Sequence, residues 1–388
     1  MRRYDSPLVV LMIILSSTGM TMVIRHSSAI ASNSNQEPEN PNQNKRIARH
    51  DVLRLLNRNR STGMPLLGIE HVFEDRQGRY WLVSAFRTHV FEERRDEWSP
   101  VAIPEHTGVH ALSTDDKLWY VPIPVPRSGP TPNIRQFPVG FNMMQTMQCF
   151  DLMSWQESEL APETRKAIEQ SESSIMSFFP GRSGKLWCLL RKFDSRDNSL
   201  MFYDGQKWTG PIEPKKSRDS EFSRAAHANI GLQDSEGYVW LPGIKVVRFD
   251  GRKNEWKGYP EAPDIFALSI YEDRKGRIWI GGADGNVCVY DKGLDVWTSY
   301  KLMDHLPKTA NKNDFDGLAT EALYQDRAGQ MMFGTRQGLF TLREAENKWE
   351  LNTSENSGLP DNWIHSISED KSGRIWIGTG HGVAILHQ

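Results

Sequence analysis

Apolar and polar residues alternate in short runs along this chain, and turn residues separate the runs at regular intervals. The clearest unit is Glu272–Ile280, in which Asp273-Arg-Lys-Gly276 follows an alternating run and precedes Trp279. Alternation with a period of two predicts strands with one buried face. The Asp side chain can accept hydrogen bonds from turn amides, and Gly can take the positive φ of a tight hairpin. Each unit therefore predicts two strands joined by a tight turn; a calcium loop would need more oxygen ligands than these turns provide.

Seven imperfect copies of the unit follow one another. The Asp-x-x-Gly turn stands at residues 75–78, 234–237, 273–276, 326–329 and 370–373, with degenerate copies at 114–117 and 181–184. A second strand pair, with its own Trp, follows most copies. In the second copy this pair is assigned to residues 147–156, displaced by an insertion at about 122–146, because Trp155 follows Asp151 as Trp208 follows Asp204. Two hairpins per unit of roughly 40 residues predict an all-β fold, a seven-bladed β-propeller of four-stranded blades over residues 47–388.

The tryptophans and the chain ends agree with a closed ring. Twelve of the 13 Trp fall on repeat positions, where we expect them to pack between blades, and Trp363 is the exception. The last copy ends at Gln388 without an outer strand, which would leave an open sheet edge. Residues 51–56 precede the first copy and are rich in Leu and Val. We therefore expect this segment to close the ring as the outer strand of blade 7.

The N-terminus has the pattern of an export signal. Arg2 and Arg3 precede the apolar run Leu8–Leu15, and Ala29-Ile-Ala31 offers a cleavage site, so residues 1–31 are predicted to be a signal peptide. The alternative is an uncleaved membrane anchor. Residues 32–46 lack apolar side chains and are predicted to be a disordered linker. We expect an exported protein, periplasmic or secreted, that has the membrane as a partner only if this segment is uncleaved.

Composition narrows the partners and the chemistry. The formal net charge is −2, which gives no electrostatic reason to expect nucleic acid. Cys149, Cys188 and Cys288 are too few and too dispersed for a disulfide framework, and no Cys/His cluster suggests a metal site. Cys188 and Cys288 are expected inside strands. We predict neither a metal nor a cofactor.

The final unit, Gly358-Leu-Pro-Asp361 through Asp370-Lys-Ser-Gly373 to Trp376-Ile-Gly-Thr379, closely resembles the repeat of the two-component regulator propeller family. Phe333-Gly-Thr335 followed by Gly338-Leu339 is similar to its second half. The resemblance covers about 69–388 and is strongest in blades 1, 5, 6 and 7. It implies extracellular recognition, often of carbohydrate-derived ligands. In family members, such repeats commonly precede a membrane span and a kinase domain. This sequence offers no segment for either, so we do not expect phosphoryl transfer from it.

Strand order predicts where a site would lie. The Asp-x-x-Gly turns share one face, whereas the insertions at 122–146, 157–174, 211–228 and 300–319 map to the other. Residues 157–172 predict a short surface helix with Pro162 near its start. Loops on a rigid scaffold commonly carry binding residues. The candidate ligand-binding residues on this face are Arg87, Arg191, Asp284, Arg336, Trp363 and His381. For each of them the alternative is a side chain that is only solvated or packed and binds no ligand.

The sequence favours a non-catalytic sensor or binding propeller over an enzyme. It contains no nucleophile elbow, zinc-protease motif, phosphate loop or dinucleotide fingerprint. The expected partner is an extracellular small molecule or glycan, or a protein. The alternative is a propeller lyase or hydrolase, in which His381, His227, Asp284 or His110 could supply acid–base groups at the channel mouth. An enzyme predicts two titratable groups converging beside a pocket; binding predicts an aromatic platform with dispersed hydrogen-bonding groups.

Overall fold

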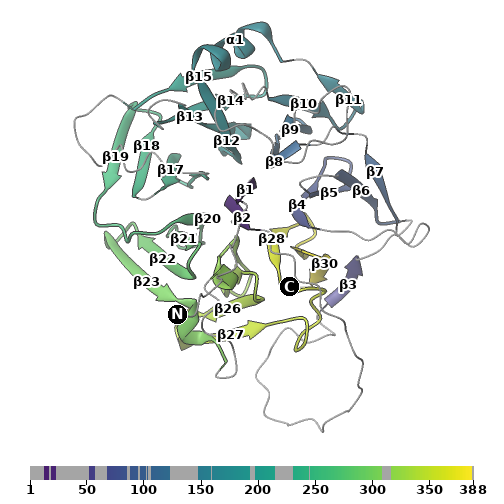
Figure 1. Cartoon of the computed structure of the whole chain (residues 1–388), viewed down its shortest axis with the longest axis vertical. Helices are drawn as coiled ribbons and strands as arrows, with labels where there is room; N and C mark the ends of the chain where they lie inside the picture. Colours follow the sequence, from purple (N-terminus) through teal and green to yellow (C-terminus); the bar gives the residue numbers. More distant parts are fainter. Residues whose placement is uncertain are drawn as a thin grey trace, which may run out of the picture.

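Seven four-stranded antiparallel sheets stand around a common axis in the computed structural model (Figure 1), which confirms the seven-bladed β-propeller. The structure describes residues 13–16, 19–22, 52–56, 68–84, 88–94, 97–101, 103, 106–122, 147–158, 160–192, 197–214, 230–243, 245–307 and 316–386.

Each blade runs from an inner strand at the axis to an outer strand at the rim. Blade 1 comprises β4 (Ile69–Glu74), β5 (Tyr80–Ser84), β6 (Thr88–Glu92) and β7 (Glu97–Val101), and blade 2 comprises β8 (His106–Leu112), β9 (Lys117–Pro122), β10 (Gln148–Asp151) and β11 (Gln156–Ser158). Blade 3 comprises β12 (Ser173–Pro180), β13 (Leu186–Lys192), β14 (Asn198–Tyr203) and β15 (Trp208–Ile212), and blade 4 comprises β16 (Leu232–Gln233), β17 (Tyr238–Pro242), β18 (Val246–Asp250) and β19 (Glu255–Tyr259). Blade 5 comprises β20 (Ala267–Glu272), β21 (Ile278–Gly282), β22 (Asn286–Asp291) and β23 (Val296–Lys301), and blade 6 comprises β24 (Ala322–Gln325), β25 (Met331–Gly334), β26 (Leu339–Arg343) and β27 (Lys348–Asn352). Blade 7 comprises β28 (Ile364–Glu369), β29 (Ile375–Thr379), β30 (Gly382–Leu386) and β3 (Val52–Leu56). Because β10 and β11 join β8 and β9, the displaced outer half of blade 2 is where the Trp155 assignment placed it.

The N-terminal segment supplies the missing outer strand. β3 pairs antiparallel with β30, with Val52 opposite Leu386 and Leu56 opposite Val383. Inner strands β28 and β4 contact each other across the junction of blades 7 and 1. The segment predicted to close the ring therefore occupies the fourth place in blade 7 and pairs the edge of β30 that would otherwise be open.

The ring has two unlike faces. We call the face with the Asp-x-x-Gly turns the turn face, where the 3₁₀ turns η3 (Arg182–Gly184) and η6 (Glu344–Glu346) lie, and the opposite one the loop face. The connections on the loop face contain α1 (Pro162–Gln170), η4 (Leu302–His305) and η5 (Asp316–Leu318). The helix predicted over residues 157–172 is shorter in the structure, because α1 runs from Pro162 to Gln170 and residues 157–158 belong to β11. Residues 123–146 and 215–229 of the predicted insertions lie outside the described part of the chain.

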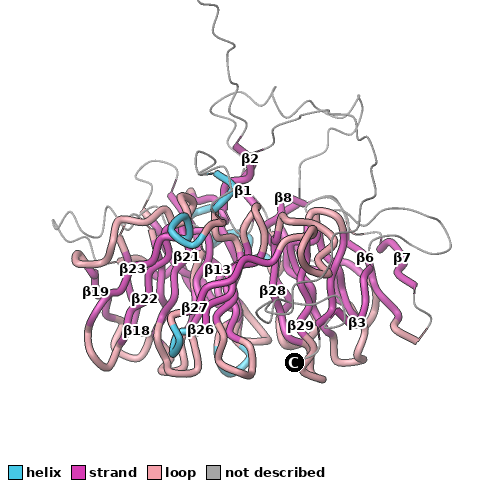
Figure 2. The backbone as a smooth tube through the Cα atoms, turned by 90° about the horizontal axis from the view of Figure 1, so that it is seen from below, coloured by secondary structure: helices cyan, strands magenta, loops and turns pink. Residues whose placement is uncertain are grey.

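A short hairpin from the N-terminus also lies on the loop face. Strands β1 (Ile13–Ser16) and β2 (Gly19–Met22) pair antiparallel and contact the inner strands β8 and β20 (Figure 2). These strands fall within the predicted signal peptide, whose cleavage stays a prediction, as does the linker at 32–46, which lies outside the described residues.

The Asp of each regular unit connects its turn to its tryptophan. Oδ1 of Asp273 accepts the backbone amides of Lys275 and Arg277 at 2.9 Å, and Gly276 closes the turn with a φ of 76°. Oδ2 accepts the indole N–H of Trp279 at 2.8 Å and Nε of Arg277 at 2.7 Å. The turn contacts were expected from the sequence, but the indole contact was not. The same indole-to-carboxylate bond joins Trp81 to Asp75, Trp240 to Asp234 and Trp376 to Asp370.

In the degenerate units of blades 2 and 3, the indole N–H has a different acceptor. In blade 3, where Gly181 stands in place of Asp, Trp187 donates to Oε1 of Gln233 from blade 4 at 3.2 Å. In blade 2 the indole of Trp119 donates to Ser113 Oγ. A buried indole N–H without a partner costs free energy, so each replacement keeps the donor satisfied.

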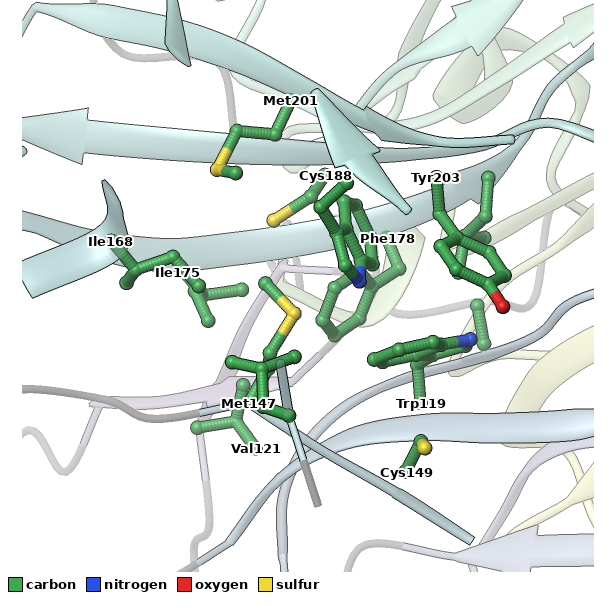
Figure 3. Close-up of a cluster of buried hydrophobic side chains, with 14 of the residues drawn as sticks. Trp119, Val121, Met147, Cys149, Ile168, Ile175, Phe178, Cys188, Met201 and Tyr203 are labelled. Carbon is green, nitrogen blue, oxygen red and sulfur yellow. The ribbon is translucent and has the colours of Figure 1, made fainter. Parts of the chain in front are cut away.

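The core consists of the interfaces between blades. Between blades 2 and 3, Trp119, Met147, Phe178 and Tyr203 pack with Ile168 of α1 (Figure 3). Cys188 and Cys288 lie in β13 and β22 as expected, and all three cysteines are free and buried. The tryptophans on repeat positions thus belong to the frame, and the search for a site moves to the axis.

Candidate functional site in the central channel

Three consecutive blades place a titratable residue at the same level of the channel. In β28 the pairs Ile364–Thr379 and Ser366–Gly378 leave His365 as a bulge, and in β4 the pairs Ile69–Ser84 and His71–Val83 leave Glu70 as one. Glu321 precedes β24, whose Ala322 pairs with Gly334, so it takes the equivalent place in blade 6. Blade 5 has Leu268 at the same bulge. These positions lie at the start of the inner strands, at the loop face.

Glu321 is a buried carboxylate with three side-chain donors around it. One oxygen accepts Nε of Arg336 at 3.0 Å, and the other accepts the indole N–H of Trp363 at 3.0 Å and lies 3.2 Å from His365 Nδ1. The Arg336 guanidinium also lies 5.0 Å from the Trp363 ring centroid. Burial works to raise the pKa of Glu321, but these donors and charges outweigh it and hold that pKa below its usual value. Glu321 is therefore ionised and organises the residues around it.

Glu70, in blade 1, is the opposite case. It is buried, and its Oε2 has no hydrogen-bond partner among the described residues. Burial, and secondarily the negative charge of Glu321, raise the pKa of Glu70 to about 8. At neutral pH the channel thus contains one ionised and one protonated carboxyl group, each set by its surroundings.

A cavity of about 230 Å³ lies in the channel beside this group. Glu321, His365, His71 and Ser366 form its polar part. The apolar part consists mainly of Phe178, Phe179, Ile230, Leu268, Ile270, Leu323 and Ile367, with Ser177 and Ser269 between them. Its lining can hydrogen-bond one edge of a small molecule while contacting an apolar face of it. The volume is below the roughly 300–1,000 Å³ of drug-sized pockets, so it suits a compact ligand.

The structure brings together two of the six residues predicted from sequence. Arg336 and Trp363 meet at Glu321, whereas Arg87 lies outside the described residues. Asp284 is exposed and accepts hydrogen bonds from Asn286, and Arg191 donates to Asn198 on the neighbouring strand.

His381 lies on the surface, with a side chain that is 72 % exposed. Its Nδ1 is 2.7 Å from Asp361 Oδ2. The predicted residues therefore do not form a single cluster. Of the other acid–base candidates, His110 lies in β8 and His227 lies outside the described residues.

Sequence reasoning missed Glu70, Glu321 and His365. Each stands at the same distance from its Asp-x-x-Gly turn, five residues before the Asp, and that shared offset was the available signal. A bulge hides it, because one extra residue breaks the alternation that tells inward from outward side chains.

Across the ranges that the structure describes, no three His, Cys, Asp or Glu side chains are arranged to hold a metal ion. No helix within those ranges is long and apolar enough to span a membrane.

Two stretches of the chain, residues 261–284 and 358–381, match the two-component regulator propeller family. No curated protein matches the chain. Among solved structures, the extracellular domain of a protein described as a hybrid two-component system of B. thetaiotaomicron is 15 % identical with a TM-score of 0.58, over 84 % of this chain and 39 % of that one. The chain thus spans well under half of that sensor.

Streptogramin B lyase is also similar in structure, with 11 % identity and a TM-score of 0.57 over 86 % of this chain and 96 % of that one. Virginiamycin B lyase from Staphylococcus aureus, in a structure with quinupristin, is 12 % identical with a TM-score of 0.56 over 86 % and 99 %. At these identities the similarities show the fold alone.

Proposed function

From a single seven-bladed ring that carries two-component regulator propeller repeats, we propose an exported sensor or binding propeller that takes a small polyhydroxylated, carbohydrate-derived ligand into its central channel. The observation that carries the proposal is the lining of the channel cavity, with Glu321, His365 and Ser366 on one part and Leu268, Ile270 and other apolar side chains on the rest. A sugar ring has hydroxyl groups at its edge and C–H groups on its faces, which matches such a lining.

The surroundings of Glu321 favour binding over turnover. Its two oxygens already accept hydrogen bonds from Arg336 and Trp363, and one of them also contacts His365. The carboxylate is therefore positioned, and its charge is compensated, before any ligand enters. A preorganised polar wall of this kind lowers the cost of ordering side chains on binding.

Thermal shift and calorimetry with mono- and oligosaccharides test the proposal, because a ligand that binds only the folded state raises the melting temperature. Ile270→Trp adds bulk to the cavity wall and should abolish the shift, whereas Ile270→Val removes one methyl group and should keep it. If no sugar stabilises the protein, or if Ile270→Trp binds as well as the unaltered chain, the channel is not the sugar site. Stabilisation by a protein partner alone would replace the carbohydrate with that partner.

A propeller lyase or hydrolase is the second candidate, and one observation favours it. His365 Nδ1 contacts Glu321 at 3.2 Å on the cavity wall, and Glu70, whose pKa is raised to about 8 by burial, occupies the equivalent position in the adjacent blade. His365 could take up a proton from a ligand, with the carboxylate of Glu321 beside it as the anionic partner. Two titratable groups on one cavity wall are what an enzyme would need.

Incubation with uronic-acid polymers and small lactones, followed by mass spectrometry, separates the two candidates. Turnover that His365→Ala abolishes while ligand binding persists supports an enzyme. Binding without turnover of any such substrate supports the sensor. A variant control, Asp361→Asn, removes the surface partner of His381 and should change neither result.

A further inference from the structure

A second cavity, of about 500 Å³, lies between blades 3 and 4 on the turn face, away from the channel. Its apolar wall consists of Trp187, Phe202, Ile212 and Phe249. The rest of its lining is polar and comes from the turns at residues 182–185, 233–237 and 251–254. Two other junctions, those of blades 5 and 6 and of blades 7 and 1, which we call the regular junctions, show what is missing at this place.

At a regular junction, an arginine bridges two carboxylates. Arg277 follows the turn of blade 5 and donates Nε to Asp273 at 2.7 Å in its own blade. Its other two nitrogens donate to Glu344, in the turn between β26 and β27 of blade 6, at 2.6 and 2.7 Å. The junction of blades 7 and 1 repeats this arrangement, with Arg374 between Asp370 and Glu93.

Both carboxylates are missing at the junction of blades 3 and 4. Gly181 stands where blade 5 has Asp273, and Lys185 stands where it has Arg277. The register pairs Asp250 with Glu255 as it pairs Arg343 with Lys348, so Gly251 takes the place of Glu344. Two acidic side chains are thus replaced by hydrogen atoms, while the cation between them is kept.

The charges that remain are mostly positive. Lys185 Nζ lies 4.3 Å from the centroid of the Phe202 ring, and Arg182 donates Nε to the carbonyl oxygen of Asp234. Neither side chain forms an ion pair with any carboxylate in the described part of the chain. The third cation of the lining, Arg252, pairs with Asp250 at 3.3 Å.

The one carboxylate of the lining is Glu236. It lies 2.8 Å from Lys292 of the neighbouring blade, which also pairs with Asp234 and Glu272 at 3.1 Å. The cavity therefore combines an aromatic wall with two cations, Lys185 and Arg182, that have no ion-pair partner among the described residues.

We propose that this cavity, which we call the inter-blade site, binds an organic anion: a carboxylate attached to a six-membered ring. The ligand's carboxylate takes the place of the missing protein carboxylates by pairing with Lys185 and Arg182, and the ring packs against Phe202 and Ile212. A flat ring suits an aromatic wall, and a cation beside an aromatic face favours an anion over a neutral molecule. Both sugar acids and aromatic acids carry this chemistry. The inference is independent of the function proposed for the channel.

Calorimetry with benzoate and glucuronate, and with the neutral benzamide and glucose, tests the inter-blade site. We expect at least one acid to bind and its neutral counterpart not to. Binding of benzoate alone identifies an aromatic acid, and binding of glucuronate alone identifies a sugar acid. Binding of the neutral compounds as tightly as the acids, or no binding of either acid at millimolar concentration, overturns the proposal.

Two matched pairs of variants locate the site. Gly251→Glu restores the carboxylate of the regular junction and should weaken binding about tenfold or more, whereas Gly251→Ala should retain it. A Cβ at position 251 meets only Phe249 Cε1, at the ordinary contact distance of 3.5 Å, so the backbone accepts a side chain there. Lys185→Gln should weaken binding to a similar extent, and Lys185→Arg should retain it. Undiminished acid binding in both Gly251→Glu and Lys185→Gln would place the anion elsewhere.

Discussion

Glu70→Gln should make the folded protein less sensitive to alkaline pH. A buried carboxyl whose pKa is raised from 4.5 to about 8 by burial and by Glu321 keeps its proton in the folded state where the unfolded chain has lost it. Between these two values the folded state binds more protons, so stability falls as pH rises. The slope is about 1.4 kcal/mol per pH unit, and the accumulated cost at pH 8 is on the order of 5 kcal/mol.

Glutamine has nearly the shape of the protonated acid and does not titrate, so it should remove this cost. Urea unfolding at pH 5, 6, 7 and 8 measures the free energy of unfolding of both proteins. We expect similar stabilities at pH 5 and a Gln variant that is several kcal/mol more stable at pH 8. Glu261→Gln, a change at an exposed position, is the control and should track the unaltered protein. Parallel profiles for Glu70→Gln and the unaltered protein would refute a protonated Glu70.

Three further changes test the frame. Asp273→Ala removes an acceptor of four hydrogen bonds and should lower the free energy of unfolding in urea by about 3–5 kcal/mol. Asp326→Ala, in the unit where Met332 replaces Trp, should cost about half as much. Equal costs would show that the indole bond contributes nothing. The pKa of Asp370 is held low because hydrogen bonds from Trp376, Ser372 and Arg374 outweigh burial, so the stabilisation that its carboxylate provides is present above about pH 4 and is lost as pH falls further. Asp370→Asn should therefore lower the melting temperature at pH 7 and flatten the decline of the melting temperature in acid. An unchanged acid profile would contradict this. Deleting residues 47–60, which contain β3, should give insoluble protein, and a soluble folded deletion would disprove that β3 is needed to close the ring.

The frame could be predicted because its signals are local. Asp273, Gly276 and Trp279 lie within seven positions, and their roles follow from the turn geometry and the alternation of one hairpin. The closing strand followed from the count of strands alone. Even the displaced half of blade 2 could be placed, because the spacing from Asp151 to Trp155 repeats that of another blade.

The candidate site could be predicted only in part, because its geometry is not local. Trp363 was singled out as an exception to the repeat and Arg336 by its place on the loop face, but the residue that joins them, Glu321, comes from a third segment. His381 and Asp284 occupy loop positions like that of Arg336, yet His381 contacts Asp361 on the surface of its own blade and Asp284 contacts Asn286. Which loop residue turns toward the axis depends on the packing of the next blade. The inter-blade site was missed for a related reason, since it consists of two absences, at Gly181 and Gly251.

The pairing of β3 with β30 has a consequence for the order of folding. Val52 and Leu386, which face each other in blade 7, are 334 positions apart in sequence (386 − 52), whereas the other strand pairs of the ring join near neighbours. Contacts between distant residues require a large loss of chain entropy before they contribute, and they form slowly. Six blades can therefore assemble in the order of the chain while the seventh waits for both ends. A chain that is translocated from its N-terminus would have to keep β3 unpaired until β30 had crossed, so its native topology is completed at a single late seam.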